Sequence, residues 1–445
     1  ADGARFRRAV PRAVRAAAPG LALGVRVSAD APRAPAIAET AVAEGVDFLS
    51  AALGDSSTYL GSARIVPPPP VEEDAIASLA SGFRLGPPLI ATSRVVDPAR
   101  AAALVAEGIA DAVGMTRALI ADPELPAKTR RGAIGAILRC VGCNVCIAHY
   151  HAGTPIACAV NPRTGRERTL ARERAGRRRR VVVVGAGPAG LAAAAESAEA
   201  GHEVVLLERS PRLGGQMALA LETPGGGATA RELIRLFERR LRSVDVRLGV
   251  AADARVVAGL EPDVVVVATG AQPYTPPLDL GGVRVAQAWD VLVEAPPEGL
   301  RVLVADWGGD PAGLDCAEML AAAGNEVTLA VASVAVGETV HQYRRNLYLE
   351  RLYRAGVEVL HHRALAGSAD GLVELANVFA PELRERREVD LLVLAQGRVP
   401  LDEVAPALRA VGLRVEEAGD CLSPRSLEEA ILEGTLAVQR IGALA

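Results

Sequence analysis

One stretch constrains the fold of this chain more than any other: residues 181–209, VVVVGAGPAGLAAAAESAEAGHEVVLLER. Four valines are followed at once by Gly185, Gly187 and Gly190 in the spacing GxGxxG. A buried strand, a tight glycine turn and a helix in this order begin a dinucleotide-binding βαβ unit. The first glycine permits the turn, the second lets a pyrophosphate approach the backbone, and the third lets helix and strand pack closely. The sequence therefore predicts a parallel α/β fold with an anion site at a helix N-terminus.

An acidic residue supports this prediction. Glu208 lies 18 residues beyond Gly190, at the end of the next expected strand, where a carboxylate can bind ribose hydroxyls. Three later segments make FAD, rather than free NAD, the expected occupant: ERSPRLGGQM (208–217), VVVVATGAQP (264–273) and AGDC (418–421). Together they resemble the flavoprotein disulfide-reductase-like superfamily with two dinucleotide domains, over about residues 179 to 445. That resemblance adds five candidate FAD residues: Gln216, Thr269, Gly270, Gly419 and Asp420.

A second, degraded copy of the plan occupies residues 301–331. Its glycines, Gly308, Gly309 and Gly313, are the candidate NAD(P) residues, although their spacing is not GxGxxG. Trp307 and Asp310 fall where phosphates would approach, and Asp310 adds negative charge. We therefore expect either an NAD(P)H site or a domain kept for packing, with weakened nucleotide binding.

Residues 140–158, CVGCNVCIAHYHAGTPIAC, hold four of the six cysteines. The candidate metal ligands are Cys140, Cys143, Cys146 and Cys158. Thiolates two residues apart can surround one soft metal centre, and a compact triplet plus one distal cysteine favours a [4Fe–4S] cluster over zinc. The nearby His149 and His151 are expected to be solvated loop residues, not ligands. Both remaining cysteines, Cys316 and Cys421, are expected to be buried thiols.

Residues 1–139 alternate short apolar strands with helices, which predicts a parallel sheet. Asp97 and Pro98 mark a helix start. We expect strands at 21–28, 46–54, 87–94 and 110–117, and a long loop with a proline run after the second strand. The opening residues, ARFRRAVPRAVRAAA, read as an amphipathic helix already under way.

Composition excludes several classes of protein. The 445 residues carry a net charge of −4, whereas nucleic-acid-binding domains usually have a strong basic excess. The basic run at 161–180 could bind nucleic acid, but such a run is more often a solvated linker that leads into a strand, and we interpret it so. No run of eighteen apolar residues or secretory signal is found, so no membrane partner is expected. Clustered cysteines indicate a metal site in a reducing compartment, which favours a cytoplasmic location.

The order of these parts resembles the old yellow enzyme-related iron–sulfur flavoproteins: 2,4-dienoyl-CoA reductase, trimethylamine and histamine dehydrogenases, and the mycofactocin-associated members. The resemblance implies an α/β fold: the C-terminal half of an FMN-binding TIM (β/α)₈ barrel, a [4Fe–4S] segment, and two Rossmann-like FAD- and NAD(P)-binding domains. The implied domains are a partial barrel with strands five to eight at 1–139 and the iron–sulfur segment with its linker at 140–178. They are followed by the FAD domain in two pieces, 179–282 and 390–445, and the NAD(P)-like domain at 283–389.

The same resemblance implies FMN-binding positions in the partial barrel. Arg26 matches the strand-five arginine at the flavin N1/O2 edge, and six further residues match the phosphate clamp: Ser93, Arg94, Gly114, Met115, Thr116 and Arg117. Phosphate commonly sits on the loops after barrel strands seven and eight. The family's catalytic histidine after strand six has no counterpart here, because no histidine precedes His149. Tyr59, expected in the long loop, is the candidate proton donor.

The implied activity passes electrons from NAD(P)H through FAD and the [4Fe–4S] cluster to FMN, which reduces an activated alkene such as an enoyl- or dienoyl-thioester. Two alternatives stay open. In the first, the protein is an amine dehydrogenase in which electrons pass through the cofactors in the opposite direction; the CxxCxxC spacing favours this alternative. In the second, the chain is an electron-transfer subunit that lacks its own substrate site. Strands one to four are absent from this sequence, so a homo-oligomer or a separate barrel half is the expected partner, because a half barrel exposes sheet edges.

Overall fold

The computed structural model describes residues 2–172 and 174–442, and the side chains of 5–172 and 174–442. Tertiary contacts divide the chain into two compact units. Unit 1 comprises Ala1–Ala152 together with Gln342–Leu347, and unit 2 comprises Gly153–His341 with Tyr348–Ala445. Within the described residues, no helix combines the length and apolarity needed to cross a membrane.

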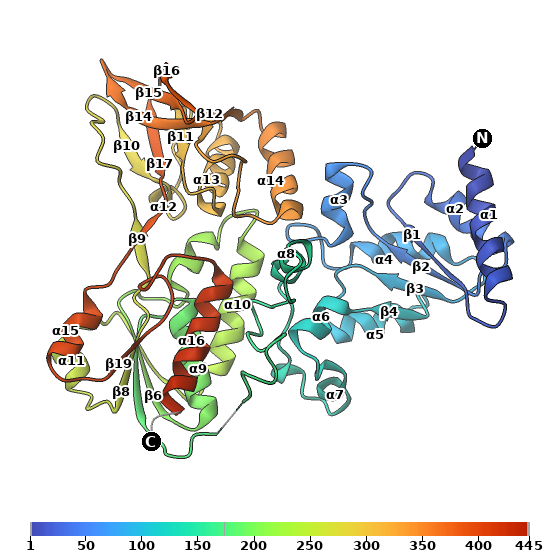
Figure 1. The fold of residues 1–445 in the computed structure, drawn as a ribbon, viewed down its shortest axis with the longest axis horizontal. Coiled ribbons are helices and arrows are strands. Elements are labelled where there is room, and N and C mark those ends of the chain that lie inside the picture. The colour runs from blue at the N-terminus through green and yellow to red at the C-terminus, as the bar shows by residue number, and fades with distance from the viewer. Residues whose placement is uncertain (1, 173, 443–445) are drawn as a thin grey trace. The chain divides into compact units, whose positions relative to one another are not determined.

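Unit 1 is built on a four-stranded sheet in the order β1-β2-β3-β4, with every neighbouring pair parallel (Figure 1). Its strands are β1 Gly24–Ser28, β2 Phe48–Ala52, β3 Leu89–Thr92 and β4 Ala112–Gly114. All four lie inside the ranges expected from the sequence, and their sequence order equals their spatial order, as in consecutive strands of a barrel. Apolar side chains from the strands and from α2, α4 and α5 form one core.

The helices of unit 1 connect and cover these strands. They are α1 Asp2–Ala17, α2 Ala34–Ala43, α3 Tyr59–Ile65, α4 Ala75–Ala80, α5 Pro98–Ala106, α6 Thr116–Ala121, α7 Leu125–Arg130 and α8 Val145–His151, with short 3₁₀ turns at Ser81–Phe83 and Ile134–Ala136. The predicted start of α5 is confirmed, because the Asp97 carboxylate accepts the Ala99 N–H at 2.8 Å. In α7, Lys128 is buried, and its Nζ lies 2.7 Å from Asp122 Oδ2.

The expected long loop after β2 is in part helical. Thr58 caps α3 through its side chain, which accepts the Gly61 N–H at 2.8 Å. Tyr59 is therefore the first residue of a helix rather than a loop residue. The side-chain amide of Asn346, from the first turns of α14 (Gln342–Arg354), donates to the Tyr59 carbonyl at 2.9 Å and so holds this helix end.

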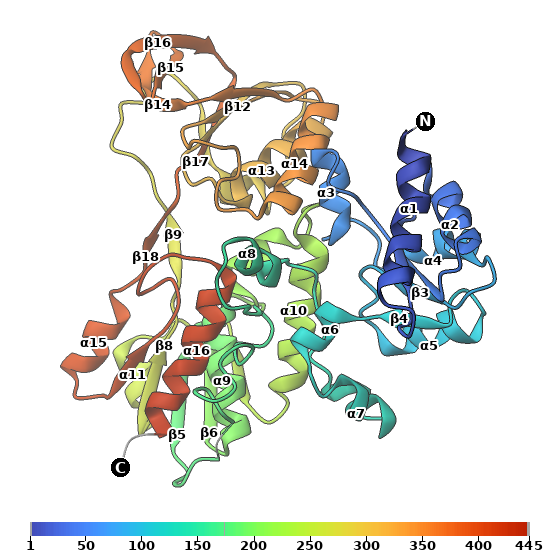
Figure 2. The ribbon, with the colours of Figure 1, turned by 45° about the vertical axis from the view of Figure 1, so that its right-hand side comes forward.

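Unit 2 contains two parallel five-stranded sheets, each belonging to one Rossmann-like fold (Figure 2). The first has the order β19-β8-β5-β6-β7, with β5 Arg180–Val184, β6 Glu203–Glu208, β7 Asp245–Leu248, β8 Val264–Val267 and β19 Val415–Glu417. The second has the order β10-β17-β11-β12-β13, with β10 Val285–Gln287, β11 Arg301–Asp306, β12 Glu326–Val331, β13 Glu358–His361 and β17 Leu391–Ala395.

Helices pack on both sheets of unit 2. They are α9 Pro188–Ala200, α10 Gly227–Arg240, α11 Ala254–Ala258, α12 Ala288–Val291, α13 Pro311–Ala322, the rest of α14, α15 Val404–Ala410 and α16 Leu427–Gly442, with a 3₁₀ turn at Gly215–Ala220. Helices α9 and α16 lie side by side (Figures 1 and 2), and a Cβ at Gly434 would come within 2.1 Å of the Ala189 carbonyl oxygen. Only glycine permits that approach.

Two smaller sheets complete unit 2. The antiparallel pair β9 (Ala271–Pro273) and β18 (Arg398–Pro400) belongs to the two chain segments that connect the Rossmann-like folds. A three-stranded antiparallel sheet packs on the second fold and consists of β14 Arg363–Ala369, β15 Leu372–Asn377 and β16 Ala380–Glu388.

Candidate cofactor-binding site

The first glycine loop of unit 2 has the geometry of a pyrophosphate site. Gly185 has φ +102°, and a Cβ there would lie 2.3 Å from the Ala268 carbonyl oxygen, so only glycine fits. A Cβ at Gly190 would lie 1.8 Å from the Gly185 carbonyl oxygen, which shows the close packing of helix on strand. Gly187 caps α9, and open space surrounds the position of its absent Cβ. The end of α9 is therefore accessible to an anion and fits FAD.

Glu208 lies at the end of β6, as predicted, and is buried. Its two carboxylate oxygens accept the N–H groups of Ala186 and Ser210, each at 2.7 Å. The carboxylate thus lies directly beside the glycine loop. This places an acceptor within reach of a ribose bound at the loop.

Two of the other predicted FAD residues, Gln216 and Asp420, form one hydrogen-bonded group with Arg398, a residue that the sequence did not single out. Gln216 Nε2 donates to Asp420 Oδ2 at 3.0 Å. Arg398 Nη1 donates to Gln216 Oε1 at 2.8 Å and to Asp420 Oδ2 at 2.6 Å. Gly270 lies against this group, with its absent Cβ 3.5 Å from Gln216 Nε2. Arg398 was missed because it is 182 residues from Gln216 in sequence.

The remaining two predicted FAD residues have structural partners nearby. Thr269 Oγ1 donates to the Leu401 carbonyl at 2.6 Å. The Gly419 N–H donates to Glu433 Oε2 at 2.8 Å, and its φ of +82° favours glycine. They hold the carboxyl ends of β8 and β19, where ligands of parallel sheets bind.

The second glycine loop is built differently, because its own carboxylates use the N–H groups that a phosphate needs. Asp306 Oδ1 accepts the Gly309 N–H at 2.9 Å. The N–H groups of Trp307 and Gly308 both donate to the Ala395 carbonyl. Asp310 caps α13 by accepting the Ala312 N–H at 2.9 Å. Asp310, predicted to crowd the phosphate approach, is therefore a helix cap, and Asp306 is a further acidic residue at the loop that the glycine spacing does not reveal.

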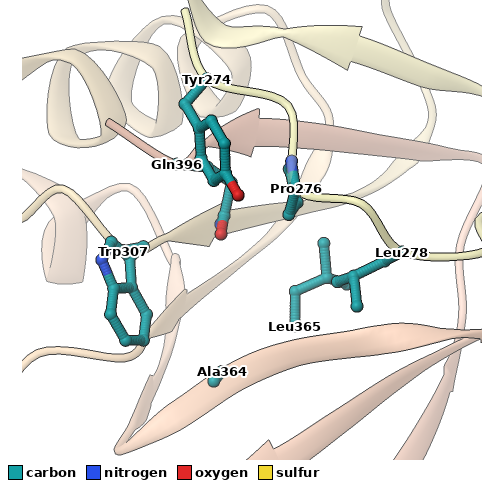
Figure 3. Close-up of a pocket in the computed structure, with 7 residues that line it drawn as sticks. All are labelled: Tyr274, Pro276, Leu278, Trp307, Ala364, Leu365 and Gln396. Carbon is teal, nitrogen blue, oxygen red and sulfur yellow. The ribbon is translucent and has the colours of Figure 1, made fainter. Parts of the chain in front are cut away.

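A pocket of about 270 Å³ adjoins this second loop (Figure 3). Trp307 follows β11 and Gln396 follows β17, so the pocket lies at the carboxyl ends of these strands. Tyr274, Trp307 and Gln396 lie toward one side of the pocket, Pro276, Leu278 and Leu365 lie toward the other, and Ala364 lies at its lower edge in this view. Trp307 is 59% exposed, so much of this residue is accessible to a ligand.

The cysteine segment places three thiols in unit 1. Burial raises the pKa of Cys143 to about 12, and neighbouring Cys140 and Cys146 act in the same direction. Burial, and next Cys140, also raise the pKa of Cys146. The three thiols are soft donors of the kind that bind iron–sulfur clusters. Within the described ranges, no three His, Cys, Asp or Glu side chains lie close enough together to hold a metal ion, and Cys158 belongs to unit 2.

The histidines beside the thiols are not in a loop. His149 and His151 end helix α8, which begins at Val145 directly after Asn144. The ring of His151 contacts that of Tyr343 edge-on at 5.2 Å between centroids, and its Nε2 lies 3.4 Å from the Tyr343 hydroxyl. The loop prediction was wrong because an Asn in the left-handed conformation (φ +63°) starts this short helix.

The predicted phosphate clamp of unit 1 lies next to the cysteine segment. Arg117 is buried and donates to Asn144 Oδ1 at 2.8 Å and to the Pro67 carbonyl at 3.1 Å. Arg94, also buried, donates to the Val71 carbonyl, and burial lowers its pKa to about 10. Both guanidinium groups therefore bind the proline-rich loop that follows α3. Their role as FMN ligands stays a prediction.

The other predicted FMN residues lie at the carboxyl ends of the strands or on them. Ser93 and Arg94 have φ values of +148° and +50°, an unusual backbone conformation that often occurs at binding sites. Gly114 ends β4, with Met115, Thr116 and Arg117 leading into α6. Arg26 is exposed on β1, and Tyr59 is 84% exposed at the start of α3.

The basic linker is not wholly solvated. Arg163 forms a two-pronged ion pair with Glu196 of α9, at 2.9 and 2.6 Å, and Arg240 of α10 donates to the same carboxylate at 2.7 Å. Burial opposes ionisation of Glu196, but the two arginines outweigh it and lower its pKa to about 2. The linker interpretation was wrong for Arg163 because the pairing carboxylate lies 33 residues further along the chain.

The fold and the first glycine loop define a flavoprotein with two dinucleotide folds. Residues 179–427, more than half of the chain, match the family described as "Pyridine nucleotide-disulphide oxidoreductase", and residues 2–134 match the "NADH:flavin oxidoreductase / NADH oxidase family". The chain belongs to the pyridine nucleotide-disulphide oxidoreductase family, and the two matches together place it among the old yellow enzyme and dienoyl-CoA reductase-like flavoenzymes.

Two curated proteins and one solved structure illustrate this kinship. N,N-dimethylglycine/sarcosine dehydrogenase of Chromohalobacter salexigens is 34% identical over 82% of this chain and 55% of its own length. Multifunctional alkene reductase/demethylase OYE of Caballeronia cordobensis is 33% identical over 72% of this chain and 48% of its own length. Histamine dehydrogenase from Rhizobium sp. 4-9 superposes with a TM-score of 0.88 and 25% identity, covering 99% of this chain and 69% of that one. The chain spans about half the length of the curated relatives it matches.

Proposed function

We propose that this chain is part of a flavin- and iron–sulfur-dependent oxidoreductase that carries electrons from NAD(P)H to an activated C=C bond, such as that of an enoyl- or dienoyl-thioester. When bound, FAD, a [4Fe–4S] cluster and FMN supply the redox chemistry. One observation carries the proposal: an FMN-family parallel sheet, a segment of three thiols and an open FAD-type glycine loop follow one another in a single chain.

Each part of the chain has its own task in this proposal. The end of α9 at Gly187 holds the FAD pyrophosphate, and Glu208 binds the adjoining ribose. The charged group of Asp420 and Arg398 fixes the remainder of FAD at the carboxyl ends of β8 and β19. Cys140, Cys143, Cys146 and Cys158 are the proposed cluster ligands, and the loops after β3 and β4 the proposed FMN phosphate site.

Amine oxidation is the second candidate, with electrons moving in the opposite direction. Two observations favour it: the CxxCxxC spacing, and the names of relatives that oxidise or demethylate amines. A substrate amine would then reduce FMN, and no reduced nicotinamide would be needed.

The first test is the cofactor content of the chain purified without oxygen. We expect FMN, FAD and about four irons with matching sulfide per chain, the content of one cubane cluster. Iron and FAD without FMN would instead support an electron-transfer part that lacks its own substrate site. Zinc in place of iron and sulfide would contradict the proposal.

The second test decides the direction of electron flow. The same protein is mixed anaerobically with NADH or with N,N-dimethylglycine, and loss of visible flavin absorbance is followed. Rapid bleaching by NADH, followed by reoxidation with an enoyl-thioester, is the expected result. Bleaching by the amine but not by NADH would contradict the proposed alkene reduction and support amine oxidation.

A further inference from the structure

The two glycine loops of unit 2 can be compared with each other, and Asp306 is a residue in which they differ. In the first loop, Gly185 directly follows β5 (Arg180–Val184), and the end of α9 is open at Gly187. In the second loop, Asp306 ends β11 and Asp310 caps α13. The same fold therefore offers an anion a free helix end in one copy and two carboxylates in the other.

The Asp306 carboxylate lies directly beneath the loop. It is 1% exposed, and its Cγ lies 3.0 Å from where a Cβ at Gly313 would be, so it occupies the space under the first turn of α13. Oδ1 accepts the Gly309 N–H. The other oxygen, Oδ2, is buried and has no hydrogen-bond partner within 2–172 and 174–442. A buried carboxylate oxygen without a donor is costly in the ionised form.

Such a carboxylate conflicts with a pyrophosphate at the loop in two ways. It occupies an N–H group that would otherwise donate to a phosphate oxygen, and its charge repels the phosphate in a medium where charges are poorly screened. Protonation removes the negative charge of the carboxylate and, with it, the repulsion of the phosphate.

On this basis we infer that Asp306 links dinucleotide binding to proton uptake, so that the second loop accepts the pyrophosphate of NAD(P)H only when the Asp306 carboxyl is protonated. The inference rests on the proposed use of NAD(P)H. The protonation state of Asp306 would then determine whether the second fold binds this anionic ligand. The nicotinamide ring of the bound ligand would reach the pocket beside Trp307.

The charges around Asp306 agree with this role. Burial raises the pKa of Asp306 to about 7, Asp310 acts in the same direction, and the N–H groups of Gly309 and Gly308 oppose it. Arg398 of β18 reaches Asp310 rather than Asp306, with Nε 3.9 Å from Asp310 Oδ2. Glu338 lies beside the loop, and its backbone nitrogen is 3.3 Å from where a Cβ at Gly309 would be. The proton would therefore be exchanged within the ordinary pH range of cells.

Calorimetric titration of the full chain, saturated with FAD, tests the inference. The probe is tetrahydro-NADH, an analogue that has the pyrophosphate but cannot donate hydride. Titrations at pH 8 in two buffers of different ionisation enthalpy should show uptake of close to one proton per ligand. Between pH 6 and pH 8 the dissociation constant should rise about tenfold, as expected for ligand binding linked to one group of pKa about 7.

Two variants identify the group. Asp306→Asn should bind without proton uptake and with the same dissociation constant at pH 6 and pH 8. Asp310→Asn keeps the helix cap, since Asn caps as well as Asp, and should bind more tightly while still taking up the proton. Nicotinamide riboside, which has no phosphate, should bind independently of pH.

The failures of the two proposals are distinguishable. Binding by the wild-type chain without proton uptake, or uptake that persists in Asp306→Asn, would overturn the role of Asp306 alone. No binding at either pH, by the wild-type chain or by Asp306→Asn, would overturn NAD(P)H as the reductant and the inference with it.

Discussion

Glu196 shows how strongly a single buried charge can contribute to this fold. It is 6% exposed and is shared by Arg163 and Arg240. Removing one partner of a buried ion pair leaves uncompensated charges, which costs about 3–5 kcal/mol. Glu196→Gln should therefore lower the free energy of unfolding by about 3 kcal/mol in urea titrations at pH 7.

The pH dependence of the same variant follows from the pKa of Glu196. Because its folded pKa is near 2 and its ordinary value is 4.5, the carboxylate stabilises the fold above pH 4.5, and this contribution is lost as the pH falls toward 2. Between pH 5 and pH 3 the wild-type chain should lose more stability than Glu196→Gln. The control is Glu199→Gln, whose exposed carboxylate pairs with Arg240 and should cost under about 1 kcal/mol. Equal losses in both variants would contradict the buried role.

Gly187 offers a test of the FAD site that does not disturb the fold. Its φ of −74° suits any residue, and its Cβ would contact nothing within 4 Å. Gly187→Val should therefore fold normally but lose FAD, because the valine occupies the approach of the pyrophosphate. Gly176→Val, also in open space but away from the loop, is the matched control and should retain FAD. Bound FAD is measured by absorbance after gel filtration, and its retention in Gly187→Val would mean that the pyrophosphate lies elsewhere.

At the scale of elements, the cysteine segment is tested by one thiol. Cys143 lies between Cys140 and Cys146 in the sequence; burial raises its pKa, and these two thiols act in the same direction. Cys143→Ser should abolish the broad visible absorbance of the cluster and lower iron content to near zero, while FAD content stays unchanged. Cys316→Ala removes a buried thiol of α13 and should keep both cofactors. Iron retained in Cys143→Ser would exclude this residue as a ligand.

Some elements can be predicted from the sequence and others cannot, for physical reasons. The strands and the first glycine loop depend on neighbours in sequence, such as Gly190 against Gly185, so local pattern predicts them. The sequence predicts a loop where helix α3 forms, because seven residues with a single threonine cap give little periodic signal. Arg398 and its partner Asp420 come together only through the antiparallel pair β9–β18, which no local pattern indicates.

At the scale of the molecule, the order of parts along the sequence is enough to predict the family. The substrate cannot be predicted in the same way, because relatives that share this order are named both as alkene reductases and as amine dehydrogenases. The second dinucleotide fold illustrates the same limit. Its irregular glycines are visible in the sequence, yet the burial of Asp306, which explains them, depends on the packing of α13 and β11.

The Lys128–Asp122 pair has a practical consequence. Lys128 is the only lysine of the chain, and its side chain is 9% exposed, with Nζ held by a carboxylate that also accepts the Leu138 N–H. Amine-directed dyes and lysine cross-linkers therefore have a single, shielded lysine target in the folded protein. Trypsin digests of the unfolded chain will be cut almost entirely after arginine. Mapping complexes of this protein calls for carboxyl-directed cross-linkers, for which its 53 acidic residues provide ample sites.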